Sequence, residues 1–136
     1  MNKFYITTAI DYVNAKPHIG HALEKVQADV LARYHRVKGD ETFFLTGTDE
    51  HGLKIFRAAQ AAGQEAQKFV DENAADYKNL KNILNLSWDD FIRTSDQKSH
   101  CPGAQKLWKA LLENGDLYKK KYEGLYCVGC ESFKTE

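Results

Sequence analysis

Two histidines that flank an isoleucine and a glycine form the most chemically informative short segment of the sequence, His18-Ile19-Gly20-His21. Two imidazoles three residues apart at the start of a helix can donate hydrogen bonds to phosphoryl oxygens as negative charge builds up in a transition state. The amides and the dipole of a helix N-terminus attract the same phosphate chain. Gly20 has no side chain, so a nucleotide base can lie against the backbone there. We therefore predict that His18 and His21 contact nucleotide phosphates.

A second polar cluster lies between two glycines, in Thr46-Gly47-Thr48-Asp49-Glu50-His51-Gly52. We interpret this segment as a loop that follows a strand. A carboxylate in such a loop can hold an ammonium group through a charge-assisted hydrogen bond. The alternative is an ordinary polar connection between a strand and a helix.

A strand, a helix and a second strand must position these two clusters. Residues 3–9 are β-branched and aromatic, which favours a strand. Residues 42–45 form a short apolar run, which is typical of a strand buried on both faces. Between them, apolar residues at helical spacing predict one face of an amphipathic helix that begins near Gly20; they are Leu23, Val26, Val30, Tyr34 and Val37. Gly39 is expected to end this helix in a left-handed conformation.

This order predicts a parallel βαβ unit with a right-handed crossover. Both strands then point the same way, so both polar clusters lie at the carboxyl edge of the sheet. Open parallel sheets bind their ligands at that edge. We therefore expect the two clusters to form one site.

The remaining sequence predicts three further helices, one strand and a hairpin. The helices span residues 53–62, 65–84 and 97–112, and the strand spans residues 91–94. The buried side of the second of these helices is expected to consist of Phe69, Ala74, Tyr77, Leu80 and Leu84. Aromatic residues around Glu123-Gly124 favour a β-hairpin in the last twenty residues. We place a domain boundary near residue 116, between segments 1–116 and 117–136.

Composition excludes several classes of protein. The chain has 136 residues, of which 43% are hydrophobic, with 19 basic and 19 acidic residues. This composition argues against a disordered chain, and the zero net charge argues against nonspecific coating of nucleic acid. No stretch reaches the ~20 apolar residues of a membrane span, and the N-terminus is too polar for a signal peptide. We expect a cytoplasmic protein with no membrane partner.

Longer segments of the sequence resemble the methionyl members of the class I aminoacyl-tRNA synthetases. The resemblance is carried in family order by residues 9–21, which read AIDYVNAKPHIGH, and by residues 43–52, 88–94 and 122–131. It implies the first half of a Rossmann-like α/β nucleotide-binding fold, followed by the start of a hairpin and zinc-knuckle insertion. The implied reaction joins methionine to ATP, with release of pyrophosphate, and passes the methionyl group to tRNA.

The resemblance also implies roles for individual residues. His18 and His21 would bind the ATP phosphates, supplied as ATP with Mg²⁺, and would stabilise the transition state, while Gly20 would lie under the adenine. Asp49 would pair with the amino group of methionine. Ile10 and Tyr12 would line the amino-acid pocket, where a thioether gains from apolar and aromatic contact. His51 is given a supporting role, and we expect Asp11 and Lys16 to be solvated residues at the pocket rim.

Cys127 and Cys130 resemble half of the family's zinc knuckle. A structural zinc site needs four protein ligands, so we expect Zn²⁺ binding to be weak or absent in this chain. His100 and Cys101 are poor candidates for the missing ligands, because they lie at the start of a predicted helix in the other segment.

The resemblance covers only the opening part of the family sequence. The Lys-Met-Ser-Lys-Ser-type loop and the anticodon-binding domain are not in this chain, and Lys119-Lys120-Lys121 is better interpreted as a solvated turn. We therefore expect no turnover by this chain alone, tRNA contact through other parts of the parent, and an unpaired sheet edge that favours dimerisation.

Two alternatives remain open at this point. A small nucleotidyltransferase also uses an H-x-G-H turn after its first parallel strand. A noncatalytic module would bind methionine or ATP without chemistry.

Overall fold

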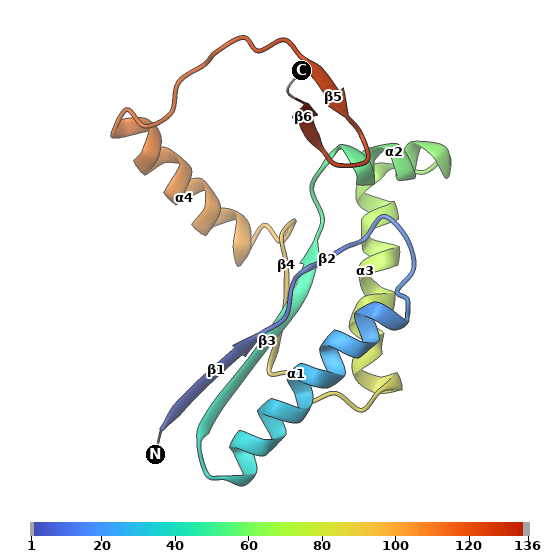
Figure 1. Cartoon of the computed structure of the whole chain (residues 1–136), viewed down its shortest axis with the longest axis vertical. Coiled ribbons are helices and arrows are strands. Elements are labelled where there is room, and N and C mark those ends of the chain that lie inside the picture. Colours follow the sequence, from blue (N-terminus) through green and yellow to red (C-terminus); the bar gives the residue numbers. More distant parts are fainter. Residues whose placement is uncertain (1, 135–136) are drawn as a thin grey trace.

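A parallel sheet organises the computed structural model, which describes residues 2–134 (Figure 1). The elements are, in chain order, β1 (Lys3–Thr7), β2 (Asp11–Tyr12), α1 (Ile19–Val37), β3 (Glu41–Asp49), α2 (Leu53–Ala61), α3 (Ala66–Ile83), β4 (Asp90–Arg93), α4 (His100–Glu113), β5 (Leu125–Cys127) and β6 (Ser132–Lys134). The predicted α/β class and the predicted helix–strand order are confirmed.

Strand β3 lies at the centre of this sheet. It pairs in parallel with β1 and β2 along one side and with β4 along the other. The pairing of Ile6 with Phe44 belongs to the β1 side, and the pairing of Thr48 with Arg93 belongs to the β4 side. The predicted parallel βαβ arrangement is therefore confirmed. The two-residue strand β2 was not predicted.

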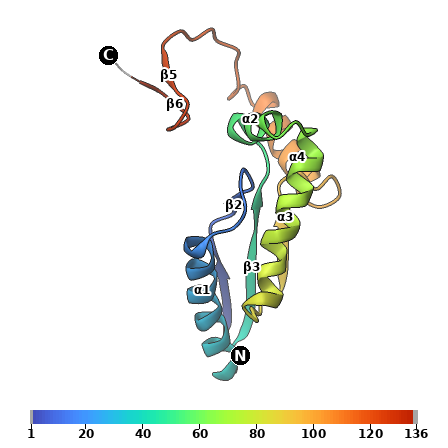
Figure 2. The ribbon, with the colours of Figure 1, turned by 90° about the vertical axis from the view of Figure 1, so that its right-hand side faces the viewer.

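Helices α1 and α3 cover one face of the sheet, and none of the helices formed by residues 2–134 covers the opposite face (Figures 1 and 2). The buried core lies between the sheet and these two helices and includes Phe44, Ala74, Tyr77 and Trp88. On the open face, the rings of Tyr5 and Phe43 pack at 6.0 Å and Phe43 is 45% exposed. The expectation that residues 42–45 are buried on both faces is therefore wrong for Phe43.

Helix α1 packs on the sheet through an unexpected face. Its buried residues are Lys25, Ala28, Asp29 and Ala32. The apolar face predicted from the helical spacing is exposed; it consists of Leu23, Val26, Val30, Tyr34 and Val37. The small side chains of Ala28 and Ala32 allow the helix to approach the sheet closely. The two buried charged residues have partners distant in sequence, since Lys25 pairs with Asp11 and Asp29 accepts a hydrogen bond from Ser87.

Strand β3 extends through the segment that we interpreted as a loop. Residues 46–49 pair within the sheet, and only residues 50–52 connect β3 to α2. Gly47 serves the strand itself, because a Cβ at this position would lie 2.1 Å from the backbone oxygen of Ile92 in β4. The glycine thus allows close packing of β4 and does not mark a turn.

The end of α1 agrees with the prediction from the sequence, whereas the start of α4 differs. Gly39 has φ +90°, which confirms the predicted left-handed end of α1. Helix α4 begins three residues later than expected, since Asp96 accepts hydrogen bonds from the amide of Lys98 and the hydroxyl of Ser99 and so holds a turn before the helix. None of the residues of α4 is buried, and the helix projects away from the sheet (Figure 1).

The last described residues form the predicted antiparallel hairpin. Cys127 pairs with Ser132, so the turn consists of residues 128–131. The turn does not lie at Glu123-Gly124, as the sequence indicated; there Gly124 packs beside Tyr122 and Phe133. Residues 119–121 are exposed, as expected. Within residues 2–134, none of the helices combines the length and the apolar character needed to span a membrane.

Candidate functional site

His18 and His21 fix each other at the start of α1. His18 is the N-cap residue, and its Nδ1 accepts the amide hydrogen of Gly20 at 3.1 Å. His21 Nδ1 accepts the amide hydrogen of His18, also at 3.1 Å, and the two rings stack 3.8 Å apart. A ring whose Nδ1 accepts a hydrogen bond carries its proton on Nε2 when neutral. In their neutral forms, both histidines therefore carry a hydrogen-bond donor on Nε2.

Gly20 is required by this arrangement. A Cβ on Gly20 would lie 2.9 Å from Cε1 of His18, which is closer than van der Waals contact allows. The glycine therefore gives the His18 imidazole room to fold over the first helical turn. Gly20 thus makes room for the His18 ring, in addition to the predicted packing of a nucleotide base against its backbone.

Helix α3 holds the segment that precedes the histidines. Tyr77 donates its hydroxyl hydrogen to the carbonyl oxygen of Tyr12 at 3.2 Å, and Asn73 Nδ2 donates to the carbonyl oxygen of Val13 at 3.0 Å. Burial, and then the charge of Asp11, raise the pKa of Tyr77 to about 12. Two buried side chains of α3 thus fix the backbone between β2 and α1.

An open cavity of about 470 Å³ lies along this segment and in front of the histidines. Its lining includes Ile10, Tyr12, His18 and His21, so the structure brings these four predicted site residues together. Asp49 does not line the cavity. It ends β3 directly opposite Tyr12 in the sheet register, and its charge contributes to the raised pKa of Tyr12, after that of Glu131.

Asp11 is not the solvated rim residue that we expected. Only 5% of it is exposed, and its carboxylate forms an ion pair with the fully buried Lys25 of α1. Successive residues of a strand point to opposite sides, so Asp11 faces α1 while Tyr12 is exposed. Lys16 is exposed, as predicted, and pairs with Asp76.

Burial lowers the pKa of His21, and this effect exceeds the opposing charge of Asp11, whose Oδ1 lies 3.9 Å from Nε2. The charges of His18 and Lys25 lower it further. A pKa below its ordinary value favours the neutral form of His21 near pH 7, and His21 is one of the residues that line the cavity.

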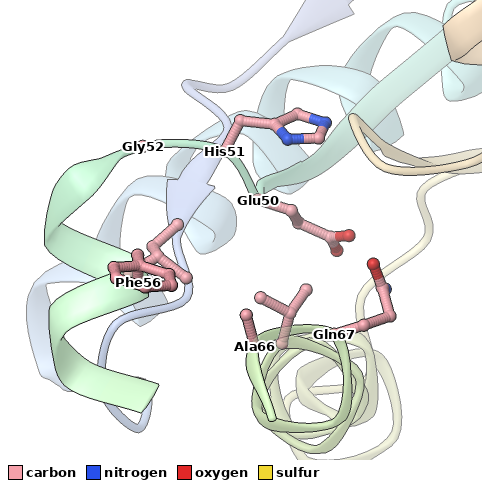
Figure 3. Close-up of a pocket in the computed structure, with 8 residues that line it drawn as sticks. Glu50, His51, Gly52, Phe56, Ala66 and Gln67 are labelled. Carbon is pink, nitrogen blue, oxygen red and sulfur yellow. The ribbon is translucent and has the colours of Figure 1, made fainter. Parts of the chain in front are cut away.

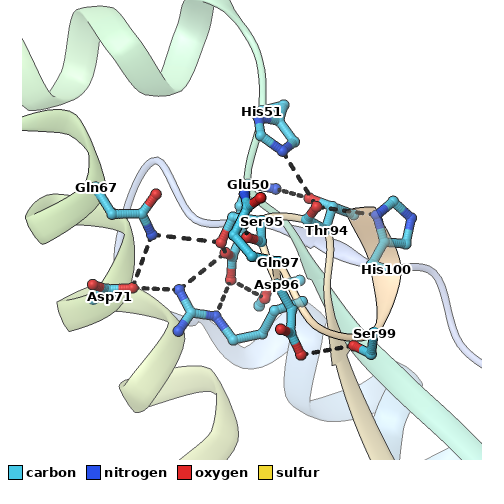
Figure 4. A network of polar contacts seen from close by, with 12 residues as sticks. Glu50, His51, Gln67, Asp71, Thr94, Ser95, Asp96, Gln97, Ser99 and His100 are labelled. Carbon is cyan, nitrogen blue, oxygen red and sulfur yellow. Dashed lines mark hydrogen bonds and ion pairs between the residues drawn. The ribbon is translucent and has the colours of Figure 1, made fainter. Parts of the chain in front are cut away.

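Glu50 and Arg93 form an ion pair that sequence reasoning missed, and it belongs to the polar network around Glu50 in Figure 4. The buried Glu50 accepts hydrogen bonds from Arg93 at 2.7 and 3.0 Å and from Thr48 at 2.6 Å. The hydroxyl of Ser95 also donates to Glu50. Hydrogen bonds from Arg93 keep the pKa of Asp71 below its usual range. The signal available in the sequence was a carboxylate directly after a strand and an arginine at the end of the next one.

His51 does not line the cavity that contains the predicted site residues. Its Nε2 lies 3.3 Å from the carbonyl oxygen of Thr94, which is also 3.0 Å from Nδ1 of His100. Together with Glu50, Gly52, Phe56 and Gln67, among others, it lines a separate cavity of about 220 Å³ between α2 and α3 (Figure 3). The structure therefore does not bring His51 together with His18 and His21.

Cys127 is the last residue of β5, and Cys130 lies within the hairpin turn. The amide of Cys130 donates to Sγ of Cys127 at 3.4 Å, and this contact lowers the pKa of the Cys127 thiol. Lys54 of α2 donates to the carbonyl oxygen of Gly129 at 3.2 Å. Among residues 2–134 there is no group of three or more His, Cys, Asp or Glu side chains that could hold a metal ion. Two thiols do not fit a complete tetrahedral zinc site.

Comparison with known proteins decides between the remaining families. Residues 4–136 match the family model described as tRNA synthetases class I (M). The chain belongs to this family. It is 52% identical to the methionine--tRNA ligase of Thermotoga maritima over 98% of this chain and 21% of that protein. It is 49% identical to the ligase of Rhizobium meliloti over 98% of this chain and 26% of that protein.

A solved structure of Mycobacterium tuberculosis methionyl-tRNA synthetase in complex with methionyl-adenylate is similar over the whole chain. Its TM-score is 0.92 at 43% identity, and the match covers 26% of that protein. The predicted Rossmann-like α/β fold and the family resemblance are confirmed, whereas the zinc-knuckle part stays a prediction. The chain spans about a fifth to a quarter of the length of the curated relatives that it matches.

Proposed function

We propose that this chain supplies the ATP-phosphate and methionine contacts of a methionine--tRNA ligase. The reaction is attack of the methionine carboxylate on the α-phosphorus of ATP, which forms methionyl-adenylate and releases pyrophosphate, followed by transfer of the methionyl group to tRNA. The observation that carries the proposal is the pair of imidazoles of His18 and His21, which are fixed through Nδ1 at a helix start and belong to residues that line the same cavity as Tyr12.

The two histidines are suited to the phosphate end of this reaction. Their donors lie where the amides of α1 also attract anions. Hydrogen bonds from fixed donors stabilise charge that develops on phosphoryl oxygens. Mg²⁺ bound to ATP would neutralise part of the same charge. His18 and His21 act as electrostatic catalysts in this proposal, and Gly20 allows their geometry.

The other end of the cavity is suited to methionine. Ile10 and Tyr12 offer an apolar and an aromatic surface to a thioether. Asp49 is outside the lining of the cavity but lies opposite Tyr12 in the sheet register, at the carboxyl end of the central strand, and we propose that its carboxylate holds the amino group. We propose these three residues as the methionine contacts and give His51 no direct contact with either substrate.

Residues 117–136 form the second part of our proposed division of the chain, after segment 1–116. Cys127 and Cys130 would supply two of four zinc ligands in the parent protein, and contact with tRNA would use regions outside this sequence. The match of the family model across residues 4–136 favours a synthetase over a small nucleotidyltransferase.

Backbone-amide NMR titrations of the chain test the proposal. We expect methionine to shift the amides of Tyr12 and Asp49 and ATP to shift those of Gly20 and His21. Leucine serves as the control for the amino acid and should leave Tyr12 and Asp49 unchanged. Equal shifts with leucine, or shifts confined to residues outside the cavity, would contradict the assignment.

A further inference from the structure

A buried ion pair lies next to the phosphate-facing histidines and has no role in the mechanism above. Lys25 Nζ contacts Asp11 Oδ2, and the two side chains are 0% and 4% exposed. Burial of two charges has a desolvation cost that their attraction offsets only with good geometry, so such a pair is weak evidence for stability alone. A role in fixing the local arrangement is the better explanation.

The pair joins the strand that faces methionine to the helix that carries the histidines. Asp11 belongs to β2, one residue before Tyr12, and Lys25 lies one helical turn after His21 on α1. The other carboxylate oxygen, Asp11 Oδ1, is 3.9 Å from His21 Nε2. Because Nδ1 of His21 accepts a backbone hydrogen bond, the ring atom nearest Asp11 is the one that carries the proton.

An uncompensated carboxylate in this position would oppose the proposed chemistry in two ways. It would favour a second proton on His21, and it would repel the phosphates that His21 is meant to receive. An opposite charge within 4–6 Å changes the proton affinity of a group roughly tenfold or more. Lys25, which does not line the cavity, compensates the charge of Asp11.

We propose that Asp11 and Lys25 act as a charge-neutral positioning pair for His21, which holds β2 against α1 and keeps the Nε2–H donor of a neutral imidazole available to a phosphoryl oxygen. The statement about phosphate rests on the proposed function. The statement about the charge state of His21 does not, because it concerns the chain without ligand.

Other groups near His21 also affect its pKa, some raising it and some lowering it. On α1, Glu24 favours the protonated ring, whereas Lys25 disfavours it; His18, the N-cap, also disfavours it. Tyr77 approaches from α3, with its ring centroid 5.2 Å from that of His21. Tyr77 is uncharged below pH 10, so Asp11 and Lys25 dominate the difference that substitutions should reveal.

Imidazole ¹⁵N NMR of the chain, followed from pH 4.5 to 8.5 without ligand, tests the proposal. Lys25→Met removes the compensating charge and should raise the pKa of His21 by about one unit. Asp11→Asn removes the attracting charge and should lower it by about the same amount. Asp11→Asn/Lys25→Met, which leaves no unpaired buried charge, should return the pKa to within about 0.3 units of the parent value.

Lys68→Met is the matched control, because Lys68 is an exposed lysine of α3 and its loss should leave His21 unchanged. If Lys25→Met does not fold, Lys25→Gln replaces it, since glutamine keeps a hydrogen-bond donor without the charge. Opposite shifts in the two single variants support the proposal. Shifts of the same sign, or shifts below about 0.3 units in both, would overturn it.

A separate titration with ATP distinguishes this inference from the proposed function. If the substitutions move the pKa of His21 in opposite directions but ATP shifts neither histidine of the parent chain, the pair controls His21 and the phosphate-binding proposal is wrong. If ATP shifts both histidines but neither substitution changes the pKa of His21, the phosphate-binding proposal is supported and the proposed control of His21 by the pair is wrong.

Discussion

Arg93 donates hydrogen bonds to both carboxylate oxygens of Glu50, from Nε at 2.7 Å and from Nη2 at 3.0 Å. Arg93 ends β4, and Glu50 directly follows the central strand β3. The same Nη2 donates to Asp71 of α3 at 2.6 Å. One guanidinium thus joins two neighbouring strand ends to a helix. Figure 4 shows the network around Glu50 and Asp71.

This relationship predicts a large loss of stability in Arg93→Met. The variant leaves the fully buried carboxylate of Glu50 without its cation, and breaking a buried pair in this way costs about 3 kcal/mol of unfolding free energy. Urea unfolding measures the effect. Arg57→Met on the exposed surface of α2 is the control and should change stability by less than about 0.5 kcal/mol. Equal unfolding free energies of the two variants would show that Arg93 does not stabilise the buried carboxylate of Glu50.

Gly20→Ala and Gly103→Ala should behave differently although both glycines are helical. Alanine favours a helix over glycine by about 1 kcal/mol, and nothing lies within 4 Å of a Cβ at Gly103. At Gly20 the new methyl group displaces the His18 ring and removes a cap worth about 1 kcal/mol. We therefore expect urea unfolding to show stabilisation only in Gly103→Ala. A similar gain in Gly20→Ala would mean that His18 does not cap α1.

Tyr77 should make the chain sensitive to alkali. The side chain ionises near pH 10 in the unfolded chain and near 12 in the folded one, so the unfolded state loses its proton first. The unfolding free energy therefore falls as pH rises from 10 to 12, by up to about 1.4 kcal/mol per pH unit. Tyr77→Phe should lack this contribution and should lose about 1 kcal/mol at pH 7 with the hydrogen bond to Tyr12. Tyr34→Phe, at an exposed position, should keep the parent pH profile.

Asp49→Asn should weaken methionine binding while leaving the fold intact. Loss of a charge-assisted hydrogen bond to the amino group costs about 1.5–3 kcal/mol, which corresponds to roughly a 10- to 100-fold weaker affinity. Isothermal titration calorimetry with methionine measures the change. Asp90→Asn, at the exposed start of β4, is the matched control. Unchanged affinity in Asp49→Asn would remove the amino-group assignment.

The sequence predicted the order of elements because the period of apolar residues changes sharply between strands and helices. Residues 65–84 show this well, since the expected buried residues Ala74, Tyr77 and Leu80 do lie in the core. The meeting of His18 and His21 with Tyr12 was also predictable, because all three belong to the short stretch between β1 and the first turn of α1. The parallel-strand argument also predicted that the cluster around Asp49 and His51 joins this site, and neither residue lines the cavity.

What escaped prediction depends on partners far away in the chain. The buried face of α1 contains Asp29, whose carboxylate accepts hydrogen bonds from the amide and the hydroxyl of Ser87 at 2.6 Å. Lys25 is buried for a similar reason, its contact with Asp11. Periodicity alone favours apolar residues for burial and cannot show that a charge has a partner. The role of Gly47 could not be predicted for the same reason, because the group that leaves no room for a side chain there is the backbone of β4.

The central claim is that the imidazoles of His18 and His21 meet the phosphates of ATP. Its most direct test is ¹⁵N NMR of the two Nε2 atoms during titration with ATP, with CTP as the comparison nucleotide. The account predicts that ATP shifts both resonances and that CTP does so only weakly. Unperturbed Nε2 resonances at saturating ATP, or stronger shifts with CTP, would contradict it.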